Sequence, residues 1–397
     1  MNFIANRTAL YKAVKTAMRA ISNFKGISEL NGLLFEADVN SGIVSITGTD
    51  IQTQIQCRIK ADHIIEGGSC ILMPIVAEML RLLPEEDVEI ANSIDNRMLD
   101  IKSGKAQYTV PFMDSEKFPK IRIPFPEDFI CVKGLNSVIK RTIFATDNAK
   151  ETQAERKSLQ FVKLSFTNGQ TKAEATDGTI AAVSETPFGS DGNLEVILHE
   201  KALDILSSIV QPNEELFVGI TGKFAVFMKQ DMFFVSMLYD GKYIEGSKLV
   251  EYIKPQYKAT VDAKELFYLA DNVAAIFSGN DDRCINVCIT NDKVVMQTKT
   301  LTGNSKAEIN ATDTIPTPGG GFNYNAKWLL SCLRQASGPL TISMDQRGFM
   351  LIEANQSKYC ISPRGPVRIR IPEPKAEKAK KPRKTKAKAE DETAIAA

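Results

Sequence analysis

Thr8-Ala9-Leu10-Tyr11-Lys12-Ala13-Val14 is the stretch that decides the fold, because its helical pattern returns twice along the chain. A similar segment surrounds Val138 and another surrounds Leu266, and both steps are 128 positions. Self-similarity at a fixed period sets the architecture of a protein. A period this long predicts three domains of one fold rather than a solenoid of small repeats.

Other landmarks keep the same period. Thr49-Asp50 closes a predicted strand, and Thr176-Asp177 closes another 127 positions later. A helix-to-strand turn at residues 82–86 returns at 209–215 and, in altered form, at 335–339. Proline-rich stretches separate the thirds and mark short linkers. We therefore expect domains at residues 1–125, 126–252 and 253–371, followed by a tail at 372–397.

Each third shows the same order of elements. An amphipathic helix comes first, then a hairpin of alternating apolar positions, a second helix, and two or three further strands. The predicted helices are residues 7–22 and 75–83, 134–148 and 199–210, and 262–277 and 325–336. Two helices and about eight strands per repeat predict an α+β fold in which helices cover one face of antiparallel sheets.

The composition is that of a soluble, cytoplasmic protein. The 397 residues are 43% hydrophobic and 24% charged, and no apolar run is long enough to cross a membrane. The seven cysteines lie mostly in apolar strand or helix contexts, which favours reduced, buried thiols. Cys284 and Cys288 have no histidine near them, so we expect no metal and no other cofactor.

The tail differs from the rest of the chain. From Glu373 to Ala397 it holds eight basic and five acidic residues and almost no large apolar side chain. Such a segment cannot repay its ordering entropy, so we expect residues 372–397 to be disordered. It is either a nonspecific tether to phosphate backbones or a solubilising tail without further consequence.

The repeat, together with three short motifs, resembles one family: the bacterial sliding clamp, the β subunit of DNA polymerase III. The motifs are Asn31-Gly32-Leu33-Leu34-Phe35, Ala175-Thr176-Asp177-Gly178 and Tyr239-Asp240-Gly241-Lys242-Tyr243. None is specific alone; their order within the repeat carries the resemblance, which covers residues 1 to about 370. It implies a DNA processivity factor: a head-to-tail homodimeric ring of six clamp domains, with the helices lining a central hole.

A ring that slides on duplex DNA should be basic only on its inner helices. Lys12, Lys15 and Arg19 have the spacing of one helix face. Further predicted DNA-binding residues are Arg7, Lys25, Lys140, Arg141, Lys150, Arg156 and Lys157. The competing interpretation is that these side chains are ordinary charged residues on solvent-exposed helix faces and do not bind DNA.

The resemblance also implies a pocket between the second and third domains that binds short partner peptides with apolar anchors. The matching residues are Leu159, Thr176, Gly178, Thr179, Ile180, Ala181, Ile244, Lys248, Leu249, Cys360, Ile361, Ser362 and Pro363. Thr179, Ile244 and Ser362 depart from the usual family pattern. The pocket's preferred peptide is therefore expected to differ.

Ring closure in the family pairs an edge strand of the first domain with one in the third. Matching positions are Tyr108 and Val110 in the first third, and Ile276 and Phe277 in the third. Expected partners are double-stranded DNA of any sequence, the polymerase III α subunit, the clamp loader, other proteins with clamp-binding motifs, and a second copy of the chain.

Catalysis finds little support in the sequence. His63 and His199 have no nucleophile motif beside them, and Gly319-Gly320-Gly321 lacks the Lys-Ser/Thr of a phosphate-binding loop. We therefore expect that the protein is not an enzyme. Two alternatives stay open: a clamp-like DNA-tethering scaffold that does not close into a ring, and an enzyme with an unrecognised site.

Overall fold

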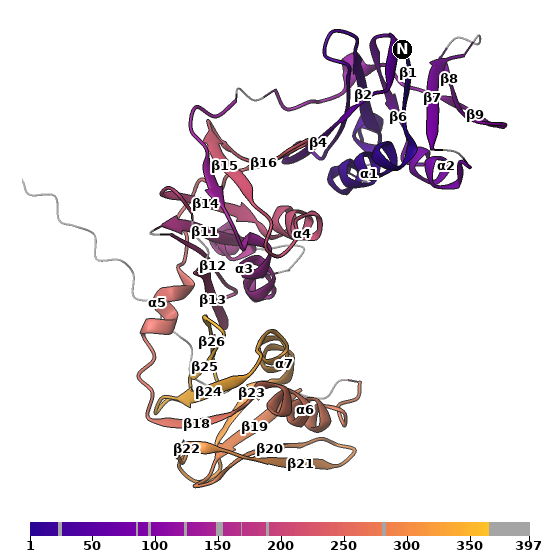
Figure 1. Cartoon of the computed structure of the whole chain (residues 1–397). Helices are drawn as coiled ribbons and strands as arrows, with labels where there is room; N and C mark the ends of the chain where they lie inside the picture. The colour runs from indigo at the N-terminus through magenta and orange to yellow at the C-terminus, as the bar shows by residue number, and fades with distance from the viewer. Residues whose placement is uncertain are drawn as a thin grey trace, which may run out of the picture. The chain divides into compact units, whose positions relative to one another are not determined.

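The computed structural model describes residues 1–22, 26–84, 86–93, 97–122, 125–147, 154–167, 169–187, 190–279 and 283–364. Within these ranges the chain forms three consecutive α+β repeats, each with two main helices packed on antiparallel strands (Figure 1). The predicted fold class is confirmed. Residues 372–397, predicted to be a disordered tail, lie outside the described residues.

The first repeat begins with a short strand that leads directly into a helix. Its elements are β1 (Asn2–Asn6), α1 (Arg7–Ala17), the 3-10 turns η1 (Met18–Ala20) and η2 (Ser28–Asn31), β2 (Leu33–Asp38), β3 (Ile43–Thr49), β4 (Thr53–Lys60), β5 (His63–Glu66), β6 (Gly68–Leu72), α2 (Val76–Leu82), β7 (Asp87–Asn92), β8 (Met98–Ser103), β9 (Ala106–Pro111) and η3 (Ser115–Lys117).

The second repeat follows the same order and ends in an additional short helix. Its elements are β10 (Ile130–Val132), α3 (Leu135–Thr142), η4 (Ile143–Ala145), η5 (Ala154–Gln160), β11 (Phe161–Thr167), β12 (Gln170–Thr176), β13 (Ile180–Thr186), β14 (Leu194–His199), α4 (Glu200–Ile209), β15 (Leu216–Thr221), β16 (Phe224–Lys229), β17 (Met232–Met237) and α5 (Gly246–Glu251).

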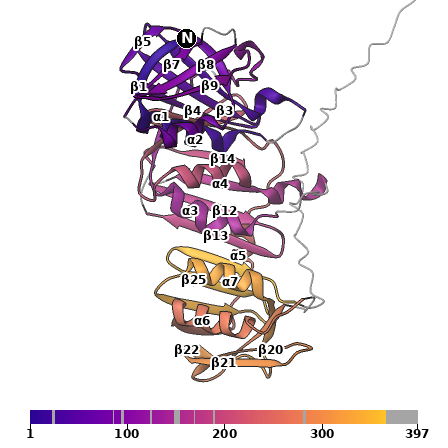
Figure 2. The ribbon, with the colours of Figure 1, turned by 90° about the vertical axis from the view of Figure 1, so that its right-hand side faces the viewer.

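The third repeat completes the described chain. Its elements are β18 (Tyr257–Asp262), α6 (Ala263–Ala274), β19 (Cys284–Ile289), β20 (Lys293–Lys299), β21 (Asn304–Asn310), β22 (Thr312–Ile315), β23 (Phe322–Asn325), α7 (Ala326–Gln335), β24 (Pro339–Met344), β25 (Met350–Ala354) and β26 (Ser357–Ile361). In Figure 2, α3 and α4 lie side by side in front of the middle repeat's strands, and α6 and α7 do so in the third.

Two of the four sheets are continuous across repeat boundaries. Strand β4 of the first repeat pairs with β17, the last strand of the second, and β13 of the second pairs with β26, the last strand of the third. The resulting orders are β10-β15-β16-β17-β4-β3-β2-β6 and β14-β11-β12-β13-β26-β25-β24-β18-β22. The two remaining sheets are β5-β1-β7-β8-β9 and β21-β20-β19-β23.

The helices bury corresponding positions in each repeat. Leu10, Val138 and Leu266, the residues that define the period, are all fully buried in the core. Side-chain caps fix the starts of α1 and α6: Asn6 accepts from the Ala9 N–H, and Asp262 accepts from the N–H groups of Lys264 and Glu265. The apolar stripe of each helix therefore packs onto its sheet at an equivalent place.

The first helices of two repeats are shorter than predicted. The expected helix 7–22 ends at Ala17 and tightens into η1, and the expected helix 134–148 ends at Thr142 and tightens into η4. A tightened last turn satisfies carbonyls that an α-helical end leaves open. The sequence spacing predicts Arg19 on the α-helix. In the structure Arg19 lies instead in the 3-10 turn η1.

Candidate functional site

The cations predicted to bind DNA fall into two groups. Lys12, Lys15 and Lys140 are solvent-exposed, and the Lys15 ammonium lies 5.6 Å from the centre of the Tyr11 ring. Lys157, in η5, is also exposed. These four side chains are available to a polyanion. Lys25 and Lys150 lie outside the described residues.

The arginines predicted to bind DNA all have partners within the protein. Arg7 donates to the Leu80 carbonyl of α2, and Arg19 donates to the Ser208 hydroxyl of α4 at 2.6 Å. Arg141 donates to the Asn355 carbonyl in the third repeat. Arg156 donates to the Asp177 carbonyl and pairs with Asp147 at 3.6 Å. Sequence spacing could not reveal these contacts, because each partner lies outside the helix or turn that carries the arginine.

The residues of the predicted peptide pocket lie around the β13–β26 junction. Ile180 and Ala181 are the Cα partners of Ile361 and Cys360, and the Ser362 N–H donates to the Thr179 carbonyl at 2.9 Å. Four separate segments therefore meet here, since α5 also packs against β12, β13 and β26, and the Leu159 side chain lies 4.0 Å from a Cβ added at Gly178.

In the predicted pocket, the buried residues of this set would form the floor and the exposed residues the rim. The buried members are Leu159, Thr176, Ile180, Ala181, Cys360, Ile361 and Ser362. The partly or fully exposed members are Gly178, Thr179, Ile244, Lys248, Leu249 and Pro363. Burial raises the pKa of the Cys360 thiol to about 12, so it remains a neutral thiol at the floor.

A Thr-Asp turn carries several of the predicted pocket residues. The Asp177 carboxylate accepts from the N–H groups of Thr179 and Ile180 at 2.7 and 2.8 Å, and the Thr176 hydroxyl donates to the Ile180 carbonyl. Burial raises the pKa of Asp177 despite these hydrogen bonds. The first repeat repeats the turn, where Asp50 accepts from Gln52 and Thr53. The sequence landmark thus corresponds to one recurrent turn geometry.

The four residues predicted to close a ring lie at or near sheet edges. Tyr108 and Val110 are on β9, the last strand of its sheet; Tyr108 is half-buried and Val110 is buried. Ile276 and Phe277 follow α6 and are half-buried. A Cβ added at Gly303, next to β21, would lie 3.2 Å from the Ile276 side chain.

The two histidines lie at the start of α4 and on β5. His199 caps α4 by accepting from the Lys201 N–H, and burial lowers the pKa of its ring. His63 is exposed on β5. Among the described residues no group of three or more His, Cys, Asp and Glu side chains is arranged to hold a metal ion. Over the same ranges, none of the helices combines the length and the hydropathy that a membrane span requires.

Comparison with known proteins agrees with this architecture. Residues 1–122 match the family model of the DNA polymerase III beta subunit, N-terminal domain. The beta sliding clamp of Halalkalibacterium halodurans is 28% identical over 259 residues, which are 61% of this chain and 66% of that protein, just under two thirds. The beta sliding clamp of Lactococcus lactis is 22% identical over 388 residues, 93% of this chain and 99% of that protein.

Solved structures show the same fold. The sliding clamp of Bacillus subtilis superposes with a TM-score of 0.81 at 22% identity, covering 91% of this chain and 98% of that one. A Pseudomonas aeruginosa sliding clamp bound to griselimycin gives a TM-score of 0.79 at 20% identity, covering 91% and 99%. The three-repeat α+β architecture is therefore a sliding-clamp fold. The chain is similar to bacterial β sliding clamps along nearly its whole length, and its first 122 residues match the N-terminal domain of the DNA polymerase III beta subunit.

Proposed function

We propose that this protein is a DNA sliding clamp: two copies close head to tail around duplex DNA and tether the replicative polymerase, the clamp loader and other partners. The role is one of binding in the cytoplasm and not of catalysis. The proposed domains are residues 1–125, 126–252 and 253–371, with 372–397 as a tail. The observation that supports a ring most strongly is the pattern of paired and unpaired strands.

The two junctions between repeats within the chain pair equivalent strands. The strand after the Thr-Asp turn of one repeat, β4 or β13, pairs with the last strand of the next repeat, β17 or β26. Their remaining counterparts are β21 in the third repeat and β9 in the first, and both stand at the end of their sheets. An unpaired edge strand is a template for another chain. Pairing β21 of one copy with β9 of the next adds a third junction of the same kind, and two copies then close a ring.

The proposed DNA contacts are four exposed lysines, three of them on α1 and α3 and one in η5. Lys12, Lys15, Lys140 and Lys157 are free of the intramolecular contacts that hold the four arginines in the described structure. Mobile ammonium groups that reach phosphates without reading bases suit sliding. Arg7, Arg19, Arg141 and Arg156 act in this proposal mainly by tying helices and repeats together, with their charge adding to the field.

The proposed partner pocket takes a short peptide with apolar anchors. Half-buried Ile244 and Leu249 above a buried floor give the apolar part, and Lys248 gives a cation at the rim. Griselimycin, present in the Pseudomonas aeruginosa neighbour, is a suitable probe for this pocket.

Retention on DNA tests the function. After loading by its clamp loader, the protein should stay on nicked circular DNA through gel filtration and should be lost when the circle is cut. Light scattering should give a mass near twice 43.8 kDa. A monomer that binds circular and linear DNA equally would favour the alternative, a tethering scaffold without a closed ring.

A further inference from the structure

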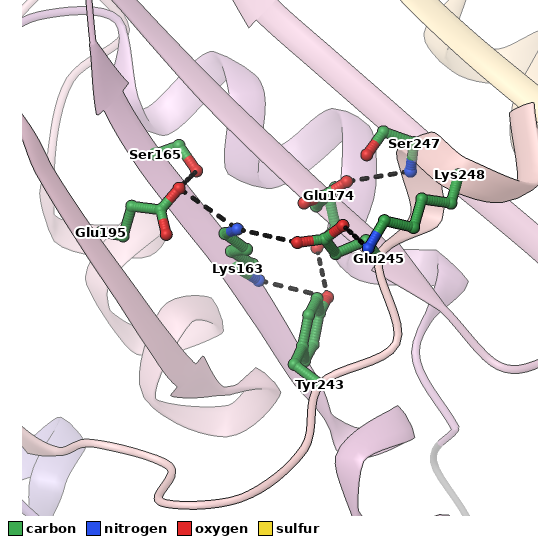
Figure 3. A network of polar contacts seen from close by, with 8 residues as sticks. All are labelled: Lys163, Ser165, Glu174, Glu195, Tyr243, Glu245, Ser247 and Lys248. Atoms are coloured by element: carbon green, nitrogen blue, oxygen red, sulfur yellow. Dashed lines mark hydrogen bonds and ion pairs between the residues drawn. The ribbon is translucent and has the colours of Figure 1, made fainter. Parts of the chain in front are cut away.

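Three residues of the proposed pocket rim, Ile244, Lys248 and Leu249, lie on one segment that enters and begins α5. The residues between them are tied to the sheet beneath (Figure 3). The Tyr243 hydroxyl donates to the Glu174 carbonyl at 2.7 Å, and the Ser247 N–H donates to the Glu174 carboxylate at 2.9 Å. The segment therefore has polar anchors at both ends.

The anchors come from a single cross-strand pair. Lys163 on β11 and Glu174 on β12 are Cα partners, so their side chains leave the same face of the sheet. Glu174 is almost completely buried. Gly246 lies close above β12, where an added Cβ would come within 3.1 Å of the Ala175 carbonyl oxygen. A side chain at this position would push α5 away from the sheet.

Lys163 supplies the central contact. Its ammonium lies 3.2 Å from Glu195 and 3.3 Å from Glu245, and its side chain is only 14% exposed. Burial alone would lower the pKa of Lys163, but hydrogen bonds to Glu195 and Glu245 outweigh burial and raise it. Glu245 also binds Lys248 at 2.7 Å through its second oxygen. One chain of charges thus joins β14, β11 and the pocket rim.

We propose that Lys163 is a positioning residue of the partner pocket: through Glu245 it fixes the direction of Ile244 and of the Lys248 ammonium toward a bound peptide. The inference rests on the proposed pocket. Lys163 does not touch the peptide itself. Without it, the segment keeps its apolar residues but loses one fixed orientation, and the peptide must then order the segment on binding.

Griselimycin titration by calorimetry tests the proposal on the full-length protein. Lys163→Met keeps the aliphatic stem and removes the ion pairs; it should weaken binding by at least about fivefold. Lys163→Arg should restore affinity. Lys133→Met is the matched control, because Lys133 pairs with Glu215 at 2.6 Å in the same repeat but away from the pocket. That variant should bind as the unmodified protein does.

Two further readouts separate positioning from general stability. Amide exchange over residues 243–249 should accelerate in Lys163→Met, while exchange over β11 and β12 stays unchanged. The affinity gap between this variant and the unmodified protein should narrow at high salt, because screening weakens the Glu245 ion pair.

Unchanged affinity in Lys163→Met would overturn the proposal. If that variant unfolds, Glu245→Gln decides, since it breaks the same contact from the more exposed side; full affinity there would also overturn it. Ile244→Asp tests the proposed pocket itself, because it replaces an apolar pocket residue by a charged one. Should Ile244→Asp bind griselimycin normally, or the unmodified protein not bind it at all, the proposed pocket would be wrong, independently of Lys163.

Discussion

At the scale of single residues, Ile51 occupies a backbone conformation that suits glycine. Its φ is 76°, and its counterpart in the second repeat is Gly178 with φ 85°. A left-handed conformation costs an L-residue about 1–2 kcal/mol, and most for a β-branched one. The Thr-Asp turn imposes the conformation through its hydrogen bonds in both repeats.

Replacing Ile51 by glycine should therefore stabilise the protein. The residue is 44% exposed, so part of its apolar surface is already in water, and the entropy cost of glycine is about 0.5–1 kcal/mol. We expect a net gain of about 0.5 kcal/mol in the free energy of unfolding, measured by urea denaturation. The converse change, Gly178→Ala, should destabilise; a loss of stability in Ile51→Gly would contradict the strain argument.

Asp177 provides a pH-dependent test of the same turn. Because burial raises its pKa in the folded state, the folded protein holds this proton more tightly than the unfolded chain. The contribution of Asp177 to stability therefore declines as the pH rises from its unfolded pKa through its folded pKa. Asp177→Asn keeps an oxygen that can accept the same backbone bonds and lacks the titration.

The stability of Asp177→Asn relative to the unmodified protein should accordingly increase with pH across that window. Urea denaturation in parallel buffers from pH 3.5 to 7 measures the difference. A relative stability that falls with rising pH would show that the carboxylate is favoured in the fold.

Residue identities did not predict which residues of the proposed pocket are buried. The resemblance brought four segments together at the β13–β26 junction, yet Ile180 and Ile361 proved fully buried and directly paired. Lys163 and Glu174 carried no signal in the sequence. Their role depends on a cross-strand partnership and on a segment some 70 to 80 residues away, which periodicity cannot specify.

At the scale of elements, periodicity predicted the six principal helices and most hairpin strands. It missed the strands that precede the first helices, such as β1 and β18, and the short helix α5. A strand of five or six residues that runs directly into a capped helix has too few alternations to stand out. Helix α5 has six residues, and tertiary packing on β12, β13 and β26 rather than propensity stabilises it.

The inner helices give the element-scale prediction. Changing Lys12, Lys15 and Lys140 together to glutamate should shorten retention on circular DNA and lower the salt dependence of binding, because each lost phosphate contact removes about 0.9 from the log–log slope. The fold should persist, since all three side chains are exposed. Lys223, Lys242 and Lys254 are exposed outside the six principal helices, and their change to glutamate is the charge-matched control. Equal losses in both triple variants would contradict a specific lining face.

At the scale of the whole molecule, the repeat fixes more than the choice of strands that would close a ring; it also fixes their register. The first residue after the turn into the last strand is Met232, Ser357 or Ala106 in the three repeats. Met232 is the Cα partner of Cys57, and Ser357 is the partner of Ser184. Cys57 and Ser184 occupy the same place in β4 and β13, which in β21 is Ala307.

This equivalence predicts that Ala106 of one copy lies opposite Ala307 of the next, and Val110 opposite Gly303, which is beside Ile276 within the same chain. The sequence alone could not predict such a register, because it follows from the junctions inside the chain. At the corresponding internal position, the Ser184 and Ser357 hydroxyl oxygens lie 2.8 Å apart. Side chains at Ala106 and Ala307 should therefore be close enough for a disulfide across the ring interface.

The double variant Ala106→Cys, Ala307→Cys should crosslink under mild oxidation into a covalent dimer that persists in denaturing gels without reductant. Two such bonds would close the ring and greatly extend its retention on circular DNA. Ala106→Cys with Lys306→Cys is the control, because a shift of one residue turns the second thiol to the opposite face of the strand. Crosslinking of the control but not of Ala106–Ala307 would show a different register, and the absence of any dimer would contradict ring closure through β9 and β21.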